Sequence, residues 1–244
     1  MKLSNKILSL SGILLLIILT VLMLQFKGIV SELVEYRQGS SKKEVEKMLN
    51  SEIISKDFSI RDFDEIELEC NASVTIRKAE DFDILVRAPE KIVNTASLQV
   101  KKEGHTLQIK CPPLSPESMM GKINIEIRMP QLLELEVNNY ARVNLLDFMA
   151  DNMEIQISGN SELVANNNTI ESLDMNCFGS SEVDFKDNKI TNAKIQAFGS
   201  NEIGITMAGG TLEGSLTGSG ELIYFGEVAD VDVKTMGSTE VIRK

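Results

Sequence analysis

The sequence is poor in the residue types that many enzymes and metal proteins depend on. Its 244 residues include no tryptophan, five prolines, three cysteines and one histidine, His105. A single histidine argues against a Ser-His-Asp triad and against a histidine-based metal site. His105 follows Gly104 between two strand-like segments, so we interpret it as part of an exposed turn. We expect no cofactor and no enzymatic activity.

The three cysteines are an odd number and show no CxxC spacing. They are Cys70, Cys111 and Cys177. This pattern signals neither a disulfide framework nor a zinc site. Cys177 alternates with apolar residues, and we interpret it as a small buried hydrophobic side chain.

Basic residues are scarce in the second half of the chain. Residues 131–244 contain 18 acidic and 7 basic residues, so the whole net charge of −11 arises there. An acidic surface repels phosphate backbones and anionic lipids. Nucleic acid is therefore excluded as a partner, whereas cationic partners and divalent ions remain open.

The first 27 residues contain the one long apolar run. Residues 7–26 carry no charge, and lysines flank them at both ends. Twenty residues at ~1.5 Å each span the hydrocarbon core of a membrane. The large side chains of residues 20–26 disfavour a cleavage site, so we predict an uncleaved transmembrane signal anchor over residues 1–27, with a cleaved signal peptide as the alternative. We place the C-terminal domain outside the cytoplasm, in a periplasmic or extracellular position.

Two further regions follow the expected anchor. Residues 28–50 are charged, contain Gly39-Ser40-Ser41, and are predicted to form a stalk with short helical pieces. In residues 51–130 apolar and polar residues alternate with a period of two. This pattern predicts short strands in an antiparallel-rich β region. Together, residues 51–244 are expected to form the folded β domain.

A repeat of 19–20 residues dominates residues 131–244. The motifs NYARV, GNSEL, GSSEV, GSNEI, GSGEL and GSTEV begin at residues 139, 159, 179, 199, 218 and 237. Alternate residues on both sides of each motif are mostly apolar, which points one side of every coil to a shared interior. The pattern predicts a parallel β-helix of about six coils whose equivalent positions stack ~4.8 Å apart.

These features make a family resemblance visible. The segment FDEIELECNASVTIRKAEDFDILVRAP, which starts at Phe63, is followed by the G-[ST]-x-E coils. Together they resemble the family called "putative auto-transporter adhesin, head GIN domain", over roughly residues 53–244. The resemblance implies a bacterial envelope location, a right-handed β-helical head and an adhesive role, and it supplies no catalytic residues. Two segments depart from the pattern, Cys70-Asn71-Ala72 and Asn139-Tyr140-Ala141-Arg142, and we expect irregular coils there.

The repeat motif places two kinds of residue in rows. The glycines are expected at corners that need positive φ or a close approach of backbones; they are Gly159, Gly179, Gly199, Gly218 and Gly237. The acidic residues are expected to stack outward as a row that ends at Arg142; they are Glu162, Glu182, Glu202, Glu221 and Glu240. The simpler interpretation is that these carboxylates point into water. The alternative is a row that binds a cation such as Ca²⁺ or a basic partner.

A run of three asparagines lies where a coil turns. We interpret Asn166, Asn167 and Asn168 as a solvated corner. At the last coil, Val241 is expected to have little cover, which predicts a homo-oligomer formed through this coil.

Three classes of function fit this architecture. The first is a membrane-anchored binding or adhesion module of the cell envelope, with a glycan or a protein as its ligand. The second is a structural or signalling component of the envelope. The third, a polysaccharide-active enzyme, needs a cleft with clustered acids and bases, and the sequence offers no such cluster.

Overall fold

The computed structural model describes residues 43, 45–94, 98–112 and 121–244. The anchor predicted for residues 1–27 lies outside this range, as does most of the predicted stalk; residues 45–49 of the stalk are helical. Within the described part of the chain, no helix is long and apolar enough to cross a membrane. The chain divides into two compact units, Met1–Lys47 and Met48–Lys244, and the description below concerns the second.

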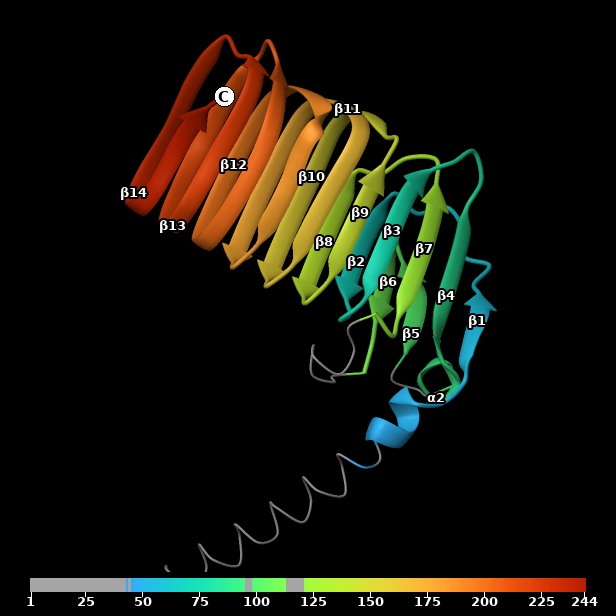
Figure 1. Cartoon of the computed structure of the whole chain (residues 1–244). Coiled ribbons are helices and arrows are strands. Elements are labelled where there is room, and N and C mark those ends of the chain that lie inside the picture. The colour runs from blue at the N-terminus through green and yellow to red at the C-terminus, as the bar shows by residue number, and fades with distance from the viewer. Residues whose placement is uncertain (1–42, 44, 95–97, 113–120) are drawn as a thin grey trace, which may run out of the picture. The chain divides into compact units, whose positions relative to one another are not determined.

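The second unit is a single β-sheet that winds into a solenoid (Figure 1). Its first strands are short: β1 (Ile53–Asp57), β2 (Glu65–Glu69), β3 (Ser73–Lys78), β4 (Asp83–Pro89), β5 (Gln99–Glu103), β6 (Thr106–Lys110) and β7 (Asn124–Met129). The later strands are β8 (Glu134–Asn139), β9 (Arg142–Leu146), β10 (Met149–Gly159), β11 (Glu162–Gly179), β12 (Glu182–Ala208), β13 (Thr211–Glu227) and β14 (Asp230–Arg243). The short helix α2 (Glu90–Val93) follows β4.

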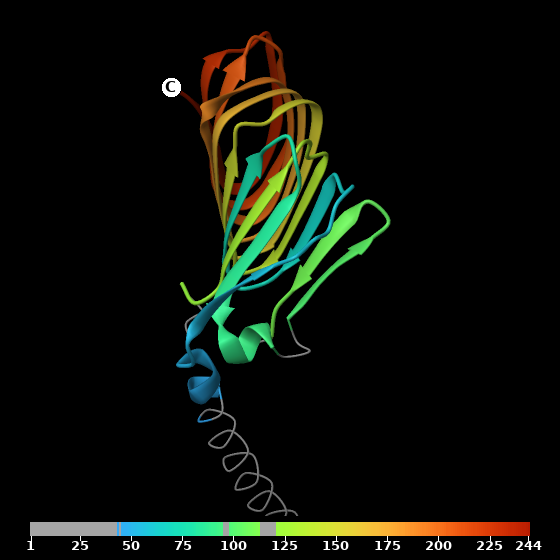
Figure 2. The same cartoon turned by 90° about the vertical axis from the view of Figure 1, so that its right-hand side faces the viewer.

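The repeat sets the register of the later strands. Strands β8 to β14 pair in parallel, and Ile155 lies in the ladder between Leu135 and Met175, each twenty residues away. From β12 onward the offset falls to nineteen, as in the pairing of Gly199 with Gly218. Figure 2 shows these coils, coloured yellow to red, as successive turns around one interior. The predicted β-solenoid of about six coils is confirmed.

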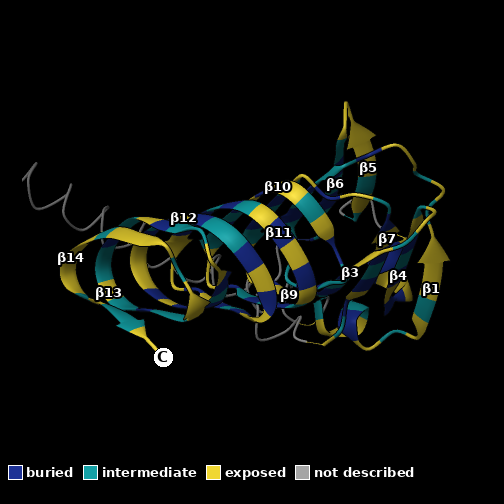
Figure 3. Cartoon of the chain, turned by 90° about the horizontal axis from the view of Figure 1, so that it is seen from above, coloured by how far each residue is buried: buried dark blue, intermediate teal, exposed yellow. Residues whose placement is uncertain are grey.

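Alternation along each strand builds the core. Inward residues from successive coils form columns, and one column consists of Leu107, Ile66, Leu135, Ile155, Met175 and Ile195, all of them buried. Figure 3 shows the alternation as bands of buried and exposed residues along the strands. The core weakens at β14, where Val231, in the column of Ala193 and Leu212, is 37% exposed. Among the described strands, β14 pairs only with β13. No described coil therefore packs against the other side of β14.

Residues 51–130 differ from the antiparallel-rich region predicted for them. Within the described chain, β2 pairs in parallel with β6 and β8, and β3 pairs in parallel with β7 and β9. Antiparallel pairing occurs between β1 and β4, between β4 and β7, and between β5 and β6. The region is therefore a mixed sheet, because the apolar positions of β2 and β3 continue the inward columns of the solenoid. Among the described strands, this region and the later coils form one continuous sheet.

The disulfide between Cys70 and Cys111 corrects the interpretation of the cysteines. The two residues follow the paired ends of β2 and β6, and their Cα atoms are 4.8 Å apart. Neighbouring parallel strands bring them together although they are 41 residues apart in sequence. Cys177 is free and buried, as interpreted, and burial raises the pKa of its thiol to about 12.

The polar corner at Asn166–168 is only partly solvated. Asn167 is exposed and has a positive φ of 58°, whereas Asn168 is 1% exposed. The Nδ2 atom of Asn168 donates to Leu145 O at 3.0 Å and to Oδ1 of Asn188 at 2.7 Å. Asn188 in turn donates to Ala165 O at 2.7 Å. The interpretation of Asn168 as solvated was therefore wrong. Stacked coils bury backbone groups at this turn, and the side-chain amides of Asn168 and Asn188 provide their hydrogen-bond partners.

Candidate functional site at the glycine corner

The five repeat glycines stack on one another at one corner of the solenoid. Each pairs in register with the next, and their φ values lie between 101° and 123°. A Cβ atom added at Gly199 would overlap the carbonyl oxygen of Gly179 on the coil below. The corner therefore requires glycine for two reasons, its positive φ and the close approach of the backbones.

The repeat glutamates form a row beside this corner, which we call the glutamate row. Its members are Glu162, Glu182, Glu202, Glu221 and Glu240. Pairing in register joins Glu162 to Glu182 and joins Glu221 to both Glu202 and Glu240. Their side chains are exposed or half-buried, and the described residues contain no group of three or more His, Cys, Asp or Glu arranged to hold a metal ion.

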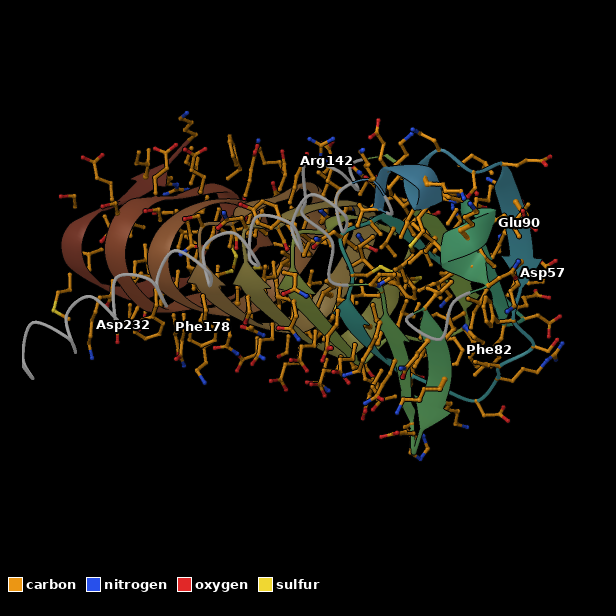
Figure 4. The ribbon with its side chains drawn as sticks, turned by 90° about the horizontal axis from the view of Figure 1, so that it is seen from below. Asp57, Phe82, Glu90, Arg142, Phe178 and Asp232 are labelled. Carbon is orange, nitrogen blue, oxygen red and sulfur yellow. A yellow bond between two sulfur atoms is a disulfide. The ribbon has the colours of Figure 1, made fainter. Side chains whose placement is uncertain are left out.

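Arg142 occupies the position before Glu162 in the same row. Its Nε atom lies 3.0 Å from Oε2 of Glu162 in an ion pair, and the two residues are direct partners in the pairing of β9 with β11. Both side chains are more than a third exposed, at 60% and 42%. Figure 4 shows Arg142 on one side of the solenoid, opposite Phe178 and Asp232. The ion pair holds the Arg142 guanidinium at the surface beside the corner.

A pocket of about 290 Å³ opens at this end of the glutamate row, and we call it the corner pocket. One wall contains Asn71, Ser73 and Gly121, and the other contains Tyr140, Arg142 and Glu162. Asn160 and Glu182 also line it. The pocket therefore brings together the two segments in which the sequence departs from the repeat motif.

A change in side-chain size between neighbouring coils explains the pocket. Arg142 N donates to Ala72 O at 3.0 Å and Tyr140 N donates to Oδ1 of Asn71 at 3.2 Å, so the two segments lie directly against each other. Ala72 and Ser73 are small, whereas Tyr140 and Arg142 are large. The large side chains consequently extend beyond the small ones, and space remains beneath them. The disulfide at Cys70 anchors the start of the wall that contains Asn71 and Ser73, which we call the small wall.

Tyr140 is the aromatic residue of the pocket. It is 45% exposed, and its Oη atom accepts a hydrogen bond of 2.5 Å from Nδ2 of Asn160 on the next coil. Glycine stands at the preceding position in the regular coils, but Asn139 stands there in this one and has a φ of 80°. Asparagine tolerates the left-handed region better than most residues, so the corner keeps its backbone shape without glycine.

A second row of carboxylates was not predicted from the sequence. Glu65, Glu134, Glu154 and Asp174 pair in register on neighbouring strands, and we call them the acid ladder. Burial, together with the charges of Glu154, Glu65 and Glu136, raises the pKa of Glu134. The ladder ends at Lys194, whose Nζ atom lies 3.3 Å from Oδ2 of Asp174. The sequence does contain the alternating acids Glu65-Ile66-Glu67 and Glu134-Leu135-Glu136. Their alignment into one row depends on the pairing of β2 with β8, which the sequence pattern did not predict.

Two further surface features lie outside the corner pocket. An open groove of about 600 Å³ runs past the acid ladder and is lined by Leu133, Glu154, Asp174, Lys194 and Glu213, among other residues. Phe178 and Phe198 stack on neighbouring coils with ring centroids 5.6 Å apart, and each is 41% exposed. Phe178 therefore provides an exposed aromatic side chain comparable to Tyr140 but outside the pocket.

Comparison with known proteins identifies the family. The family described as "Putative auto-transporter adhesin, head GIN domain" matches residues 62–228. The structure is similar to that of a protein described as a putative adhesin from Bacteroides fragilis, with a TM-score of 0.64, 15% sequence identity, and coverage of 80% of this chain and 99% of that chain. It is also similar to a protein described as a putative lipid binding protein from Parabacteroides distasonis, with a TM-score of 0.52, 19% identity, and coverage of 80% of this chain and 98% of that chain.

Both structural similarities concern the fold, since the identities are low. The comparison with curated proteins gives no match. The family match covers more than half of the chain, including both walls of the corner pocket. The chain therefore belongs to the family described as "Putative auto-transporter adhesin, head GIN domain".

Proposed function

We propose that this chain is a non-enzymatic binding module of the bacterial cell envelope, and that it holds its ligand at the corner pocket. The observation that carries the proposal is the position of the pocket, at the point where both irregular segments meet. The regular coils present one repeated pattern, whereas this site presents a distinct set of side chains. A distinct set of polar groups with an aromatic side chain is typical of a specific binding site.

The chemistry of the pocket favours binding over catalysis. Its cationic side chain, Arg142, is paired with Glu162, and the phenol of Tyr140 accepts a hydrogen bond from Asn160. These groups are arranged to offer hydrogen bonds, and among the described residues that line the pocket no nucleophile is held against a general base.

A position outside the cytoplasm is part of the proposal. A disulfide persists in oxidising compartments and is rare in the cytosol. Cys70 and Cys111 form one; Cys70 is buried directly before Asn71 of the pocket, and Cys111 is half-buried. The apolar run at residues 7–26 would anchor the module to the membrane. The family's description as an adhesin head agrees with an outward-facing role.

Binding by the full-length chain, purified in detergent, would test the proposed function. The chain would be presented to glycans and proteins extracted from bacterial envelopes and from host surfaces. We expect retention of at least one component by the wild type and its loss from the double variant Tyr140→Ala, Arg142→Ala. Phe178→Ala is the matched control, because it removes an equally exposed aromatic side chain outside the pocket, and it should bind as the wild type does.

Two results would contradict the proposal. Retention that is unchanged in the double variant would move the binding site away from the corner pocket. A wild type that retains no component would favour a structural role in the envelope. The location is tested separately, by trapping free thiols in intact cells with an alkylating reagent, because Cys70 and Cys111 should be found oxidised.

A further inference from the structure

The ligand class of the corner pocket follows from its aromatic ring, its charges and its size. We infer that the pocket binds a neutral sugar, as one ring of a larger glycan, with the ring of Tyr140 against the sugar and the Arg142–Glu162 pair holding its hydroxyl groups. This inference rests on the proposed function and deepens it.

Hydrogen bonds hold Tyr140 in place, so its ring offers a fixed aromatic surface. Its hydroxyl is bonded to Asn160 and its backbone N–H to Asn71, so both ends of the residue are fixed before a ligand arrives. A fixed tyrosine contributes contact area at a low cost in conformational entropy. The negative face of an aromatic ring attracts polarised hydrogens, and the C–H face of a sugar ring presents such hydrogens.

The charges of the pocket favour a neutral ligand with many hydroxyls. Arg142 contributes one positive charge, and Glu162 and Glu182 contribute two negative charges. An anionic ligand would meet both carboxylates, and a cationic ligand would meet the guanidinium. A hydroxyl group avoids both conflicts, because it donates to a carboxylate and accepts from a guanidinium.

The ion pair also leaves hydrogen-bonding capacity for a ligand. The ion pair places Nε of Arg142 3.0 Å from Oε2 of Glu162, and a guanidinium has five N–H donors in all. The amide of Asn160 and the hydroxyl of Ser73 add further polar groups to the walls. Sugar recognition requires several such groups directed at one ring, and the pocket offers them from both walls.

The volume limits the size of the ligand. At about 290 Å³, the pocket lies at the lower end of the ~300–1,000 Å³ range typical of small-molecule sites. One sugar ring fits this volume better than an extended chain, so the remainder of a glycan would continue over the surface of the solenoid.

Titration of the full-length chain in detergent with defined sugars would test the inference. The probes are neutral N-acetylglucosamine and galactose oligomers, sialyllactose and a sulfated disaccharide as anionic probes, and spermidine as a cationic probe. Saturation-transfer NMR would detect binding, and calorimetry would measure its affinity. We expect a neutral oligomer to bind, with affinity at least about tenfold weaker in Tyr140→Ala and in Arg142→Gln, and unchanged in Phe178→Ala.

A second variant keeps the inference testable if the first two lose stability. Ser73→Phe fills the pocket from the opposite wall and leaves Tyr140 and Arg142 intact, so it should also abolish sugar binding while thermal unfolding stays near that of the wild type. Stronger binding of an anionic probe or of spermidine than of any neutral oligomer would overturn the inference. So would neutral-sugar binding that survives both Tyr140→Ala and Ser73→Phe. Envelope binding that the pocket variants abolish, without binding of any neutral probe, would leave the proposed function standing and reject the sugar.

Discussion

The regular coils and the two irregular segments differ in what their corners can do. From Gly159 onward, each corner places a glycine against the backbone of the previous coil and leaves no space for a side chain. At Asn71 and Asn139 the glycine is missing, and the side chains change size from one coil to the next. Repetition therefore builds a scaffold with a closed corner, and a local departure from the repeat opens a pocket on it.

The two regions also differ in charge. Each regular coil carries a glutamate at the same position, and these residues form the glutamate row. The irregular coil has Arg142 at this position, which forms an ion pair with Glu162. Like charges directly opposite on neighbouring strands are unfavourable. The departure at Arg142 thus relieves one end of the row and provides the pocket with its cation.

The largest expected effect comes from adding a side chain to the closed corner. Gly199→Val should lower the free energy of unfolding by about 3–5 kcal/mol, because the new Cβ overlaps Gly179 O and valine is strained at positive φ. Gly209→Val is the matched control, since Gly209 has a similar φ of 107° but nothing within 4 Å of an added Cβ. The control should lose only about 1–2 kcal/mol. Chemical denaturation of both variants would measure the difference, and equal losses would contradict the close packing of the corner.

The next effect concerns the irregular region and its disulfide. Replacing Cys70 and Cys111 together by alanine should lower the free energy of unfolding by about 2–4 kcal/mol, because the disulfide closes a long loop in the unfolded chain. Ligand binding should weaken as well, since Asn71 follows Cys70 directly and Ser73 lies three residues after it. Denaturation with and without a reducing agent is the measurement. Reductant should destabilise the wild type and leave the double variant unchanged, and a wild type that is insensitive to reduction would contradict this role.

A smaller effect distinguishes the acid ladder from the glutamate row. Glu134→Gln should stabilise the protein at neutral pH by about 0.2–1 kcal/mol, because it removes a carboxylate crowded by its neighbours on β2 and β10. The pKa of Glu134 is raised in the folded state, so the wild type loses stability as pH rises through that pKa. The advantage of the variant should therefore disappear below about pH 4, where the carboxyl is protonated in both states.

Thermal unfolding of Glu134→Gln across a pH series would measure this effect. Glu182→Gln, in the exposed glutamate row, is the control and should change stability less. An advantage of Glu134→Gln that is constant across the series would show that charge repulsion is not its cause.

The smallest expected effect is that of Ca²⁺ on the glutamate row. Exposed carboxylates in a single row bind a divalent ion weakly, and ligand stabilisation depends on occupancy, so millimolar Ca²⁺ should raise the unfolding temperature by less than about 1 °C. Differential scanning fluorimetry with Ca²⁺ and with Mg²⁺ is the measurement. A large rise that is specific to Ca²⁺, and that disappears in the double variant Glu182→Gln, Glu202→Gln, would make the row a cation site.

The coil architecture and the glycine corner could be predicted from the amino-acid sequence alone. In a parallel β-helix, a residue pairs with its equivalent one coil away, so the intervals of 19 and 20 residues specify the register directly. Alternation specifies which side chains face inward, and motif glycines mark corners with positive φ. The same periodicity aligned the glutamates and showed that Tyr140 and Arg142 depart from the motif.

The contacts between segments outside the repeat could not be predicted in this way and depend on how the chain packs. The stacking of β2 and β3 between the later coils and β6 and β7 formed the disulfide, the acid ladder and the small wall of the corner pocket. These segments are joined by no constant interval, so periodicity carries no information about their register. Pairing between strands of unequal spacing depends on how their apolar faces fill a common interior, and that is a property of the packed chain.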